Sequence, residues 1–576
     1  MLVFNIFSLI HHSMKAPTLL PSLLASTGLL AILAMLSACG NSNSTSLKNN
    51  SLVYCTEGSP TTFNPQQATT SITFDASARV MFDRLVEYDE DLQSLQPGLA
   101  ESWQVSDDGL HYIFKLRQNI PFHQTEYWTP SRDFAAEDVI FSFQRQLDIH
   151  HPYHKVGLGK YPMINASGLN HLIRDMIKID DHTVEFILSR PNLKFPSLLA
   201  MEFASIQSAE YATSLYDNQE RFDHYPIGTG PFIFQRYETD TYIRYKTNQA
   251  YWRGPAKIKT LVFAISAEAS TRLGRLITKE CDVMSQPLPS QIKIIKNSPS
   301  LKLESQPGLN VAYWAFNTRR APFDDVRVRR ALSYAISRET IIKVVYENAA
   351  HIANGPLPPR MLGAIITQPT IKQNLQFSRQ LLHEAQWDKN FVVDIWAMPV
   401  QRPYNPNARR MAELIQNDLA KVQVKSRIIS YEWGQFLNRL RMGQHQTVLL
   451  GWSADTNDPD DFLTPLLSCN SAKTGTNRAF WCDEQFDQNL RLARETTAEK
   501  RLNALAKAQQ IFKQQLPWLP IAHSQQFLAY RNNLVGIKLS ATGGINFRKV
   551  YRVLPLSKQE NKIDALKKLT TDGAKQ

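Results

Sequence analysis

No Pro/Gly/Ser-rich linker separates the amino-terminal half of this sequence from its carboxy-terminal half. A chain of 576 residues is nevertheless too long for one hydrophobic core, so it must build at least two. Because no linker joins these cores, we expect two lobes connected by strands that cross from one lobe to the other. A chain of this length can also enclose a ligand completely.

Short β-rich runs alternate with helical stretches along the chain. Residues 112–116 and 183–188 are rich in aromatic and β-branched residues, as strands are. Residues 411–421 carry apolar side chains at helical spacing, and a strand-like run follows at 424–429. With 43% apolar and 20% charged residues the composition is that of a globular protein. The predicted fold class is therefore α/β with an open sheet.

The amino-terminal region has the features of an export signal. Residues 19–36 are apolar, Lys15 precedes them, and the sequence LSACG follows at 36–40. Small residues before a cysteine are what a lipoprotein signal peptidase requires. We therefore expect a signal peptide over residues 1–38 and a diacylglycerol on the thiol of Cys39.

The alternative interpretations of this region are an ordinary cleavable signal and a short membrane anchor. Pro21 and Gly28 interrupt the apolar stretch, which is also short for a membrane span. No Lys or Arg precedes Met14, so Met14 is the more natural initiator. Residues 39–50 are rich in Ser and Asn and predict a flexible tether, and residues 557–576 predict a disordered tail.

Four cysteines remain after Cys39. They are Cys55, Cys281, Cys469 and Cys482. An even number in an oxidising compartment favours two disulfides, for which three pairings are possible. We expect Cys55 with Cys281 and Cys469 with Cys482. A zinc site is the alternative, but no CxxC spacing supports it.

Composition and motifs argue against several function classes. The net charge is +12, but the 64 Lys and Arg are scattered among 52 acidic residues, so no nucleic-acid surface is expected. Pro152 breaks the histidine-rich segment at 150–154, which favours a surface loop over a metal site. No complete GxSxG, HExxH or P-loop motif is present. We therefore expect no enzyme activity, cofactor or metal.

Several ordered motifs resemble the family 5 extracellular solute-binding proteins of peptide ABC transporters. The likeness runs from about residue 51 to 554. The motifs are PGLAESW (97–103), SDDG (106–109), YIFKLR (112–117), PIGTGPF (226–232), YWRG (251–254), PGLNV (307–311) and DVRVRRAL (325–332).

Two branches of this family share features with the chain. WAMPVQRPYNPNARR at 396–410 resembles the dipeptide-binding branch. YWTP at 127–130 and GWSADTNDPD at 451–460 resemble the branch that takes up antimicrobial peptides. Haem-binding lipoproteins are further relatives of the dipeptide-binding branch. Dipeptides, antimicrobial peptides and haem are thus the candidate ligands.

The resemblance implies a two-lobed periplasmic binding protein of type II, in the large peptide-binding subclass. Lobe I would comprise residues 51–309, completed by 527–556, with an inserted subdomain at about 83–232. Lobe II would comprise residues 310–526. The implied hinge strands are 309–317 and 521–531.

The resemblance also implies two ligand-binding residues, and two aromatic residues that flank them are further candidates. Asp455 matches the aspartate that pairs with a peptide amino group, and Arg402 matches the arginine that pairs with its carboxylate, which suits the bidentate guanidinium. Each residue adds ~3.3 to 3.6 Å to an extended peptide, so two fixed anchors would select dipeptides. Tyr404 and Trp452 would form the cleft wall. The structural alternatives are a turn cap for Asp455, a surface position for Arg402 and a core position for Trp452.

The expected partners are a peptide, ABC permease subunits and, through the lipid, a membrane. We expect no binding to nucleic acid. The protein is expected to be a monomer. The location is the periplasm. Within binding proteins the alternatives are antimicrobial peptide or haem capture. An adhesin or chaperone-like lipoprotein could reuse the same fold.

Overall fold

The computed structural model describes residues 50–89, 94–365, 371–454, 456–474, 476–540 and 544–553. The predicted signal peptide, Cys39, all of the tether except Asn50, the carboxy-terminal tail and Asp455 lie outside these residues.

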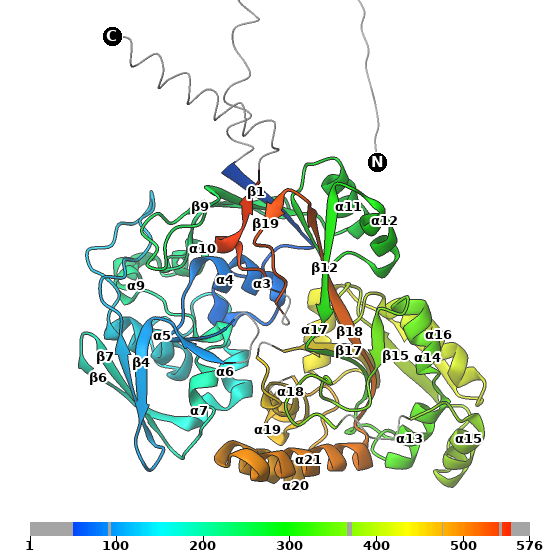
Figure 1. Cartoon of the computed structure of the whole chain (residues 1–576). Helices are drawn as coiled ribbons and strands as arrows, with labels where there is room; N and C mark the ends of the chain where they lie inside the picture. The colour runs from blue at the N-terminus through cyan, green and yellow to red at the C-terminus, as the bar shows by residue number, and fades with distance from the viewer. Residues whose placement is uncertain are drawn as a thin grey trace, which may run out of the picture. The chain divides into compact units, whose positions relative to one another are not determined.

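Twelve of the described strands form one continuous sheet (Figure 1). Along its main path lie, in order, β16 (Lys425–Ile429), β15 (Val392–Ala397), β17 (Thr447–Ser453), β13 (Asn310–Phe316), β18 (Trp518–Arg531), β11 (Val283–Ser285), β1 (Ser51–Thr56), β10 (Thr260–Ile265), β9 (Tyr242–Thr247) and β8 (Phe232–Glu238). Two further strands, β12 (Leu301–Pro307) and β14 (Ala350–Ile352), also pair with β18.

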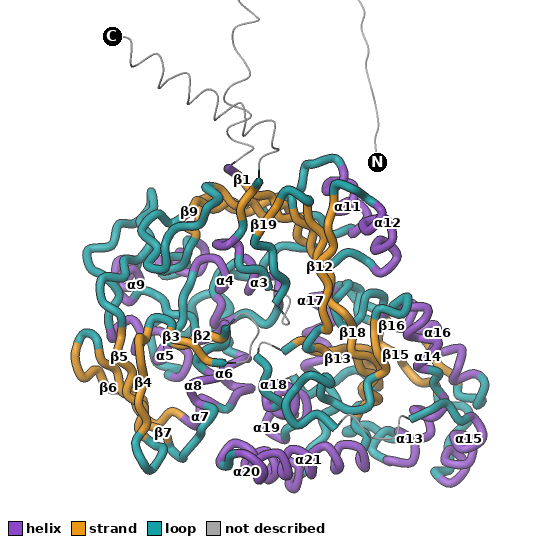
Figure 2. The backbone as a smooth tube through the Cα atoms, viewed as in Figure 1, coloured by secondary structure: helices purple, strands orange, loops and turns teal. Residues whose placement is uncertain are grey.

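The remaining described strands form smaller antiparallel sheets. The first has the order β4 (Ala100–Val105), β5 (His111–Leu116), β7 (Thr183–Leu188) and β6 (Ile173–Asp180). The others are β2 (Val86–Tyr88) with β3 (Leu95–Pro97), and β19 (Leu534–Val535) with β20 (Tyr551–Arg552). Figure 2 shows β4 to β7 as a group of strands separate from the large sheet.

Helices surround these sheets, so the α/β class is confirmed. In the first half they are α3 (Ser71–Ala76), α4 (Ala78–Met81), α5 (Ala136–Leu147), α6 (Pro162–Ser167), α7 (Leu169–Leu172), α8 (Phe195–Leu198), α9 (Ala209–Ser214), α10 (Arg221–His224), α11 (Ala269–Ile277) and α12 (Ile292–Asn297). In the second half they are α13 (Val326–Ala335), α14 (Arg338–Val345), α15 (Leu375–Glu384), α16 (Ala408–Ala420), α17 (Trp433–Arg441), α18 (Asp460–Leu467), α19 (Cys469–Thr474), α20 (Glu484–Glu495) and α21 (Ala498–Gln515). The α16–β16 unit confirms the helix and strand predicted at 411–429. In the described part of the chain, none of these helices has the length and apolarity that a bilayer crossing demands.

Strand β18 connects the two halves of the large sheet. The first part of β18 pairs with β13 and β14, and its second part pairs with β12 and β11. Figure 1 shows β12 and β18 running side by side between the two halves. Its 14 residues span roughly 46 Å at about 3.3 Å per residue. Most of its side chains are buried, as expected for a strand covered on both faces.

The second connection between the halves runs through the turn from β12 to β13. Gly308 lies in this turn, where an added Cβ would come within 2.1 Å of Asn310 Nδ2 and 3.0 Å of the carbonyl oxygen of Ser524. Only glycine allows the two connecting segments to approach this closely. The predicted hinge strands at 309–317 and 521–531 thus coincide with β13 and part of β18. Their hinge role and the predicted lobe boundaries stay predictions.

Three large apolar cores underlie this arrangement. One is built from buried residues between 309 and 522, and a second from residues between 85 and 227. A third combines β1 and β10 with the end of β18. Tyr88 and Trp452 pack against both the first and the second core. These two aromatic side chains therefore join two cores that are otherwise distant in sequence.

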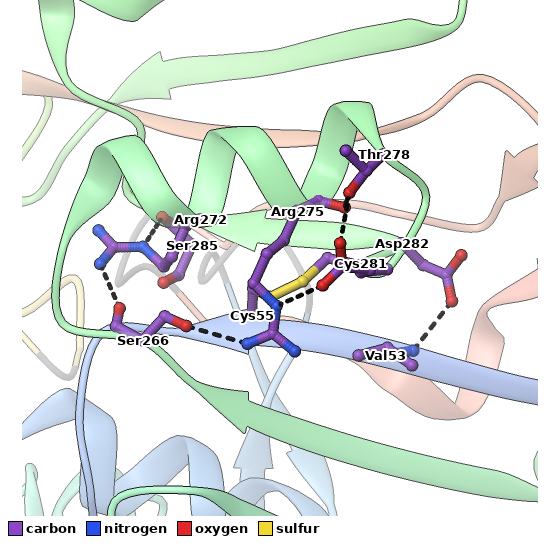
Figure 3. Close-up of a disulfide and its surroundings, with 10 residues drawn as sticks. Val53, Cys55, Ser266, Arg272, Arg275, Thr278, Cys281, Asp282 and Ser285 are labelled. Atoms are coloured by element: carbon purple, nitrogen blue, oxygen red, sulfur yellow. Dashed lines mark hydrogen bonds and ion pairs between the residues drawn. A yellow bond between two sulfur atoms is a disulfide. The ribbon is translucent and has the colours of Figure 1, made fainter.

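Both expected disulfides are present. Cys55 in β1 is bonded to Cys281, which precedes β11, and Figure 3 shows this bond. Cys469 at the start of α19 is bonded to Cys482, 13 residues further on. On the chain-entropy estimate, closing the shorter loop stabilises the fold by about 3 kcal/mol. The disulfide that closes the longer loop holds β1 close to β11, and β11 lies beside β18 in the sheet.

Three histidines among the described residues are buried and hydrogen-bonded to backbone carbonyls. Each ring donates an N–H to a carbonyl, from His123 to Gly230 (2.9 Å), from His445 to Arg478 (2.8 Å) and from His523 to Asn310 (2.7 Å). Burial lowers the pKa of each imidazole from 6.5 to about 4. The folded protein therefore holds these rings neutral at pH values where the unfolded chain protonates them.

This difference predicts a loss of stability in mild acid. Stability contributed by a neutral buried histidine is complete above pH 6.5 and decreases as the pH falls towards 4. Between pH 7 and pH 5 each ring should account for about 2 kcal/mol of the loss. His445→Gln keeps an N–H donor, so the variant should lose about 2 kcal/mol less than the wild type over this range. Denaturant unfolding at both pH values measures the difference.

The control is His150→Gln, because His150 is exposed. An identical pH dependence in His445→Gln and the wild type would show that the buried ring is not responsible.

Candidate functional site

Parallel pairing brings two of the sequence motifs to one edge of the sheet. Strand β15 runs parallel to β17, with Ala397 beside Leu449. The loop that carries Arg402 follows β15, and the segment containing Asp455 follows β17. Ligands of open α/β sheets bind outside the carboxyl ends of such strands. The strand order therefore places the two motifs where a ligand site is expected.

Arg402 lines a pocket with an empty volume of about 770 Å³. Its guanidinium donates a hydrogen bond from Nη1 to the Gln401 carbonyl (3.0 Å) and lies 4.8 Å from the ring centre of Trp433. Within the described part of the chain, no carboxylate forms an ion pair with it. Most donors of this guanidinium are thus left for an anionic group.

The loop around Arg402 is held by side chains from other elements. Ser524 Oγ of β18 donates to the Pro403 carbonyl (2.6 Å), and the Tyr346 hydroxyl donates to the Tyr404 carbonyl (2.7 Å). The backbone N–H groups of Arg402 and Asn405 each donate to the other residue's carbonyl. The loop is therefore ordered before any ligand binds, which lowers the entropic cost of binding.

Of the two predicted cleft-wall aromatics, Tyr404 belongs to this loop and Trp452 lies in β17. The Tyr404 ring packs on Gly451, where an added Cβ would come within 2.2 Å of Tyr404 Cδ2. Burial raises the pKa of Tyr404, and the charge of Arg402 partly opposes this. Trp452 packs against two cores, and its Nε1 has no hydrogen-bond partner in the described chain. Neither residue borders the Arg402 pocket, so their contact with a ligand stays a prediction.

Further residues of the pocket wall have no sequence motif that marks them. They include Tyr54, Asp75, Ser285, Gln286 and Gln526. Asp75 forms an ion pair with Arg79 (2.7 Å), yet burial still raises its pKa to about 6. Only Gln526 lies in a segment that the sequence singled out, the predicted hinge strand.

The histidines at 150–154 contact residues of the surrounding structure. Among the described residues, no group of three or more potential metal ligands is clustered. His151 packs on the Phe141 ring, and His154 Nδ1 lies 2.9 Å from the Arg145 carbonyl. Both are partly buried, so the segment is less exposed than a surface loop.

A second pocket of about 470 Å³ lies between α6 and α18. Asp458 forms an ion pair there with Lys194, which comes from the other core. Asp458 also accepts hydrogen bonds from Arg501 at 2.8 and 3.0 Å. One carboxylate thus connects α21 of the first core with a residue beside α8 of the second.

The two cations that pair with Asp458 should contribute unequally to stability. Asp458→Asn would leave the Arg501 guanidinium without its ion-pair partner. Because the Arg501 side chain is only 7% exposed, this change should cost roughly 3 kcal/mol of stability. Lys194→Met leaves the Arg501 pair intact and should cost less than about 1 kcal/mol. Denaturant unfolding of both variants gives the comparison.

Glu238→Gln, in an exposed ion pair with Arg236, is the control and should change little. Equal losses in Asp458→Asn and Lys194→Met would contradict the assignment of Arg501 as the main partner.

Comparison with known proteins adds independent information. The profile of the bacterial extracellular solute-binding proteins, family 5, matches residues 94–474. The dipeptide-binding protein of Escherichia coli K12 is 44% identical over 508 residues, which cover 88% of this chain and 95% of that protein. Heme-binding protein A of Haemophilus influenzae is 40% identical over 532 residues, which cover 90% of this chain and 97% of that protein. The probable periplasmic-binding protein SapA of E. coli is 38% identical over 511 residues, covering 88% and 93%.

Solved structures agree with this result. A dipeptide binding protein from Pseudoalteromonas sp. SM9913 in complex with Met-Leu superposes with a TM-score of 0.84 at 41% identity, covering 87% of this chain and 100% of that one. DppA from Helicobacter pylori in complex with the peptide STSA superposes with a TM-score of 0.81 at 30% identity. The superposition covers 88% of this chain and 100% of that one. The chain shares its two-lobed architecture with these proteins.

Proposed function

Because this chain belongs to the bacterial extracellular solute-binding proteins of family 5, we propose that it captures dipeptides and other short peptides for a peptide ABC importer. The observation that carries the proposal is the guanidinium of Arg402, which lines a pocket without an acidic partner among the described residues. Relatives named as dipeptide-binding proteins and a structure with bound Met-Leu support the same ligand class.

In this proposal the two ends of the peptide bind to two anchors. Arg402 binds the α-carboxylate, and Asp455 binds the α-ammonium group. A zwitterion buried in a cleft requires both charges to be compensated. Since both anchors follow parallel neighbouring strands, we expect a separation that suits a dipeptide, into which an extra residue of ~3.3 to 3.6 Å would not fit. Tyr404 and Trp452 support the two anchors as cleft-wall residues.

Peptide binding would favour a closed arrangement of the two lobes. Lobe I comprises residues 51–309 and 527–556, with the subdomain at about 83–232 inserted, and lobe II comprises 310–526. The hinge strands at 309–317 and 521–531 would allow the lobes to close on the ligand. A ligand that contacts both lobes stabilises the closed state by its differential affinity. The permease would then recognise this state and receive the peptide, which is delivered without chemical conversion.

The protein would act as a monomer at a membrane surface in the periplasm. Cys39, after cleavage of residues 1–38, would carry the lipid, and the Ser/Asn-rich tether would give the folded part room to reach the permease. One lipid-bearing residue and a basic protein surface are compatible with an anionic membrane.

The anchor assignment can be tested by calorimetric titration with a dipeptide mixture. The protein is first unfolded and refolded to remove carried ligand. Arg402→Ala and Asp455→Ala should each weaken dipeptide binding by roughly 2 to 5 kcal/mol, or about 30- to 5,000-fold, because a buried charge loses its partner. Arg402→Lys should fall between Ala and wild type, since an ammonium group lacks the bidentate geometry.

Arg409→Ala is the matched control, because the Arg409 side chain is exposed on α16. Wild-type affinity in both alanine variants would refute the anchor assignment. Tetrapeptides, a cationic antimicrobial peptide and haemin belong in the same titration, because other relatives are a SapA protein and a heme-binding protein. If one of these ligands binds and the dipeptides do not, that ligand would replace dipeptides in the proposed function.

Lipidation is tested by detergent phase partitioning of protein expressed in a Gram-negative host. The wild type should enter the detergent phase, and Cys39→Ser should remain in the aqueous phase, because a lipid chain supplies the only strong apolar anchor expected. Cys39 differs from the other cysteines in having no expected disulfide partner. Equal partitioning of both proteins would rule out the lipid at this position.

A further inference from the structure

Two glutamines in the Arg402 pocket have unused hydrogen-bonding atoms. Gln526, only 5% exposed, lines the pocket, and neither its Oε1 nor its Nε2 has a partner within the described chain. The buried Oε1 of Gln286, in the same wall, also lacks a partner there. Buried amides are normally hydrogen-bonded, so this pair requires an explanation.

The backbone fixes the position of both side chains. Gln526 lies in β18 opposite Gln306 of β12, whose own amide donates to the Leu539 carbonyl. Gln286 has a positive φ of 43°, which is uncommon for a residue with a side chain.

The buried cation Arg272 holds the Gln286 turn. Arg272, which is fully buried, donates to the carbonyls of Ser285 and Gln286, both at 3.4 Å. Figure 3 shows Arg272 and Ser285 close to the disulfide between Cys55 and Cys281. The turn that presents Gln286 is therefore attached to α11 through Arg272 and lies near the disulfide-bonded part of the sheet.

The charges in the pocket indicate what kind of group these amides could receive. Asp75 already pairs with Arg79, and Arg402 is assigned to the peptide carboxylate. A cationic or anionic side chain would thus lack a free counter-ion among the described pocket residues. A neutral group with both a donor and an acceptor is the chemical complement of a carboxamide.

We propose that Gln526 and Gln286 form a subsite for the side chain of the peptide's carboxy-terminal residue and favour a neutral, hydrogen-bonding side chain such as that of glutamine. This inference rests on the proposed function, because Arg402 must hold the adjacent carboxylate. Rotation about the terminal torsion of Gln526, which has a broad profile, presents its amide to the bound side chain. An apolar side chain leaves these amides unpaired and binds more weakly.

The test compares four dipeptides by calorimetric titration of the refolded full chain. Ala-Gln and Ala-Met have side chains of similar length, and Gln-Ala and Met-Ala place the same side chains at the amino end. The wild type should bind Ala-Gln at least tenfold more tightly than Ala-Met. Gln526→Met should remove this preference and leave the ratio between Gln-Ala and Met-Ala unchanged.

Two further variants keep the test decisive if Gln526→Met is poorly folded. Gln286→Met changes a less buried member of the pair and should reduce the preference for Ala-Gln. Gln380→Met, on the exposed face of α15, is the control and should retain it.

Equal affinity of the wild type for Ala-Gln and Ala-Met would overturn the subsite, as would a preference that survives both Gln526→Met and Gln286→Met. Failure of all four dipeptides to bind would instead overturn the proposed function and the subsite with it.

Discussion

The remainder of the structure relies on how β18 is hydrogen-bonded where it passes from one half of the sheet to the other. Its neighbours change there from β13 to β12, after a register shift in the β13 ladder between Ala312 and Tyr313. Beyond the end of that ladder the side chain of Asn310 takes over, because its Oδ1 accepts from the Ser524 N–H (2.9 Å) and its Nδ2 donates to the Ser524 carbonyl (3.2 Å). A buried backbone group without such a partner would cost free energy comparable to a lost hydrogen bond. A side-chain amide thus replaces a strand at the crossing.

The same crossing organises the pocket. Ser524 also holds the Pro403 carbonyl, so the loop that carries Arg402 is attached to the connecting strand as well as to β15. Two residues further along β18, Gln526 lines the pocket opposite that loop. Any change in the angle between the two halves must therefore alter the pocket, which couples ligand contact to the arrangement of the lobes.

The sequence predicted the parts of this structure that local patterns encode. Runs rich in aromatic and β-branched residues identified β5 and β7, helical spacing identified α16, and an even number of cysteines suggested two disulfides. The Arg402 motif was found because its residues are contiguous. The roles of Gln526 and Asp458 were not predicted. The role of Asp458 depends on partners far away in the chain, such as Lys194, and that of Gln526 depends on a pocket that distant segments form together. Asp455 lies outside the described residues, so its position is still a prediction from the motif alone.

The distribution of charge explains why one arginine stands out. Asp75 is paired with Arg79, and Asp458 with Arg501 and Lys194, so the protein itself neutralises these buried acids. The Arg402 guanidinium donates to a carbonyl and lies over an aromatic ring, and within the described chain no carboxylate forms an ion pair with it. In a partly buried site a guanidinium without a counter-ion favours binding of an anion over any neutral group. In the proposed function, internal pairing elsewhere thus concentrates anion recognition at Arg402, and the neutral glutamines beside it would be free to discriminate among side chains.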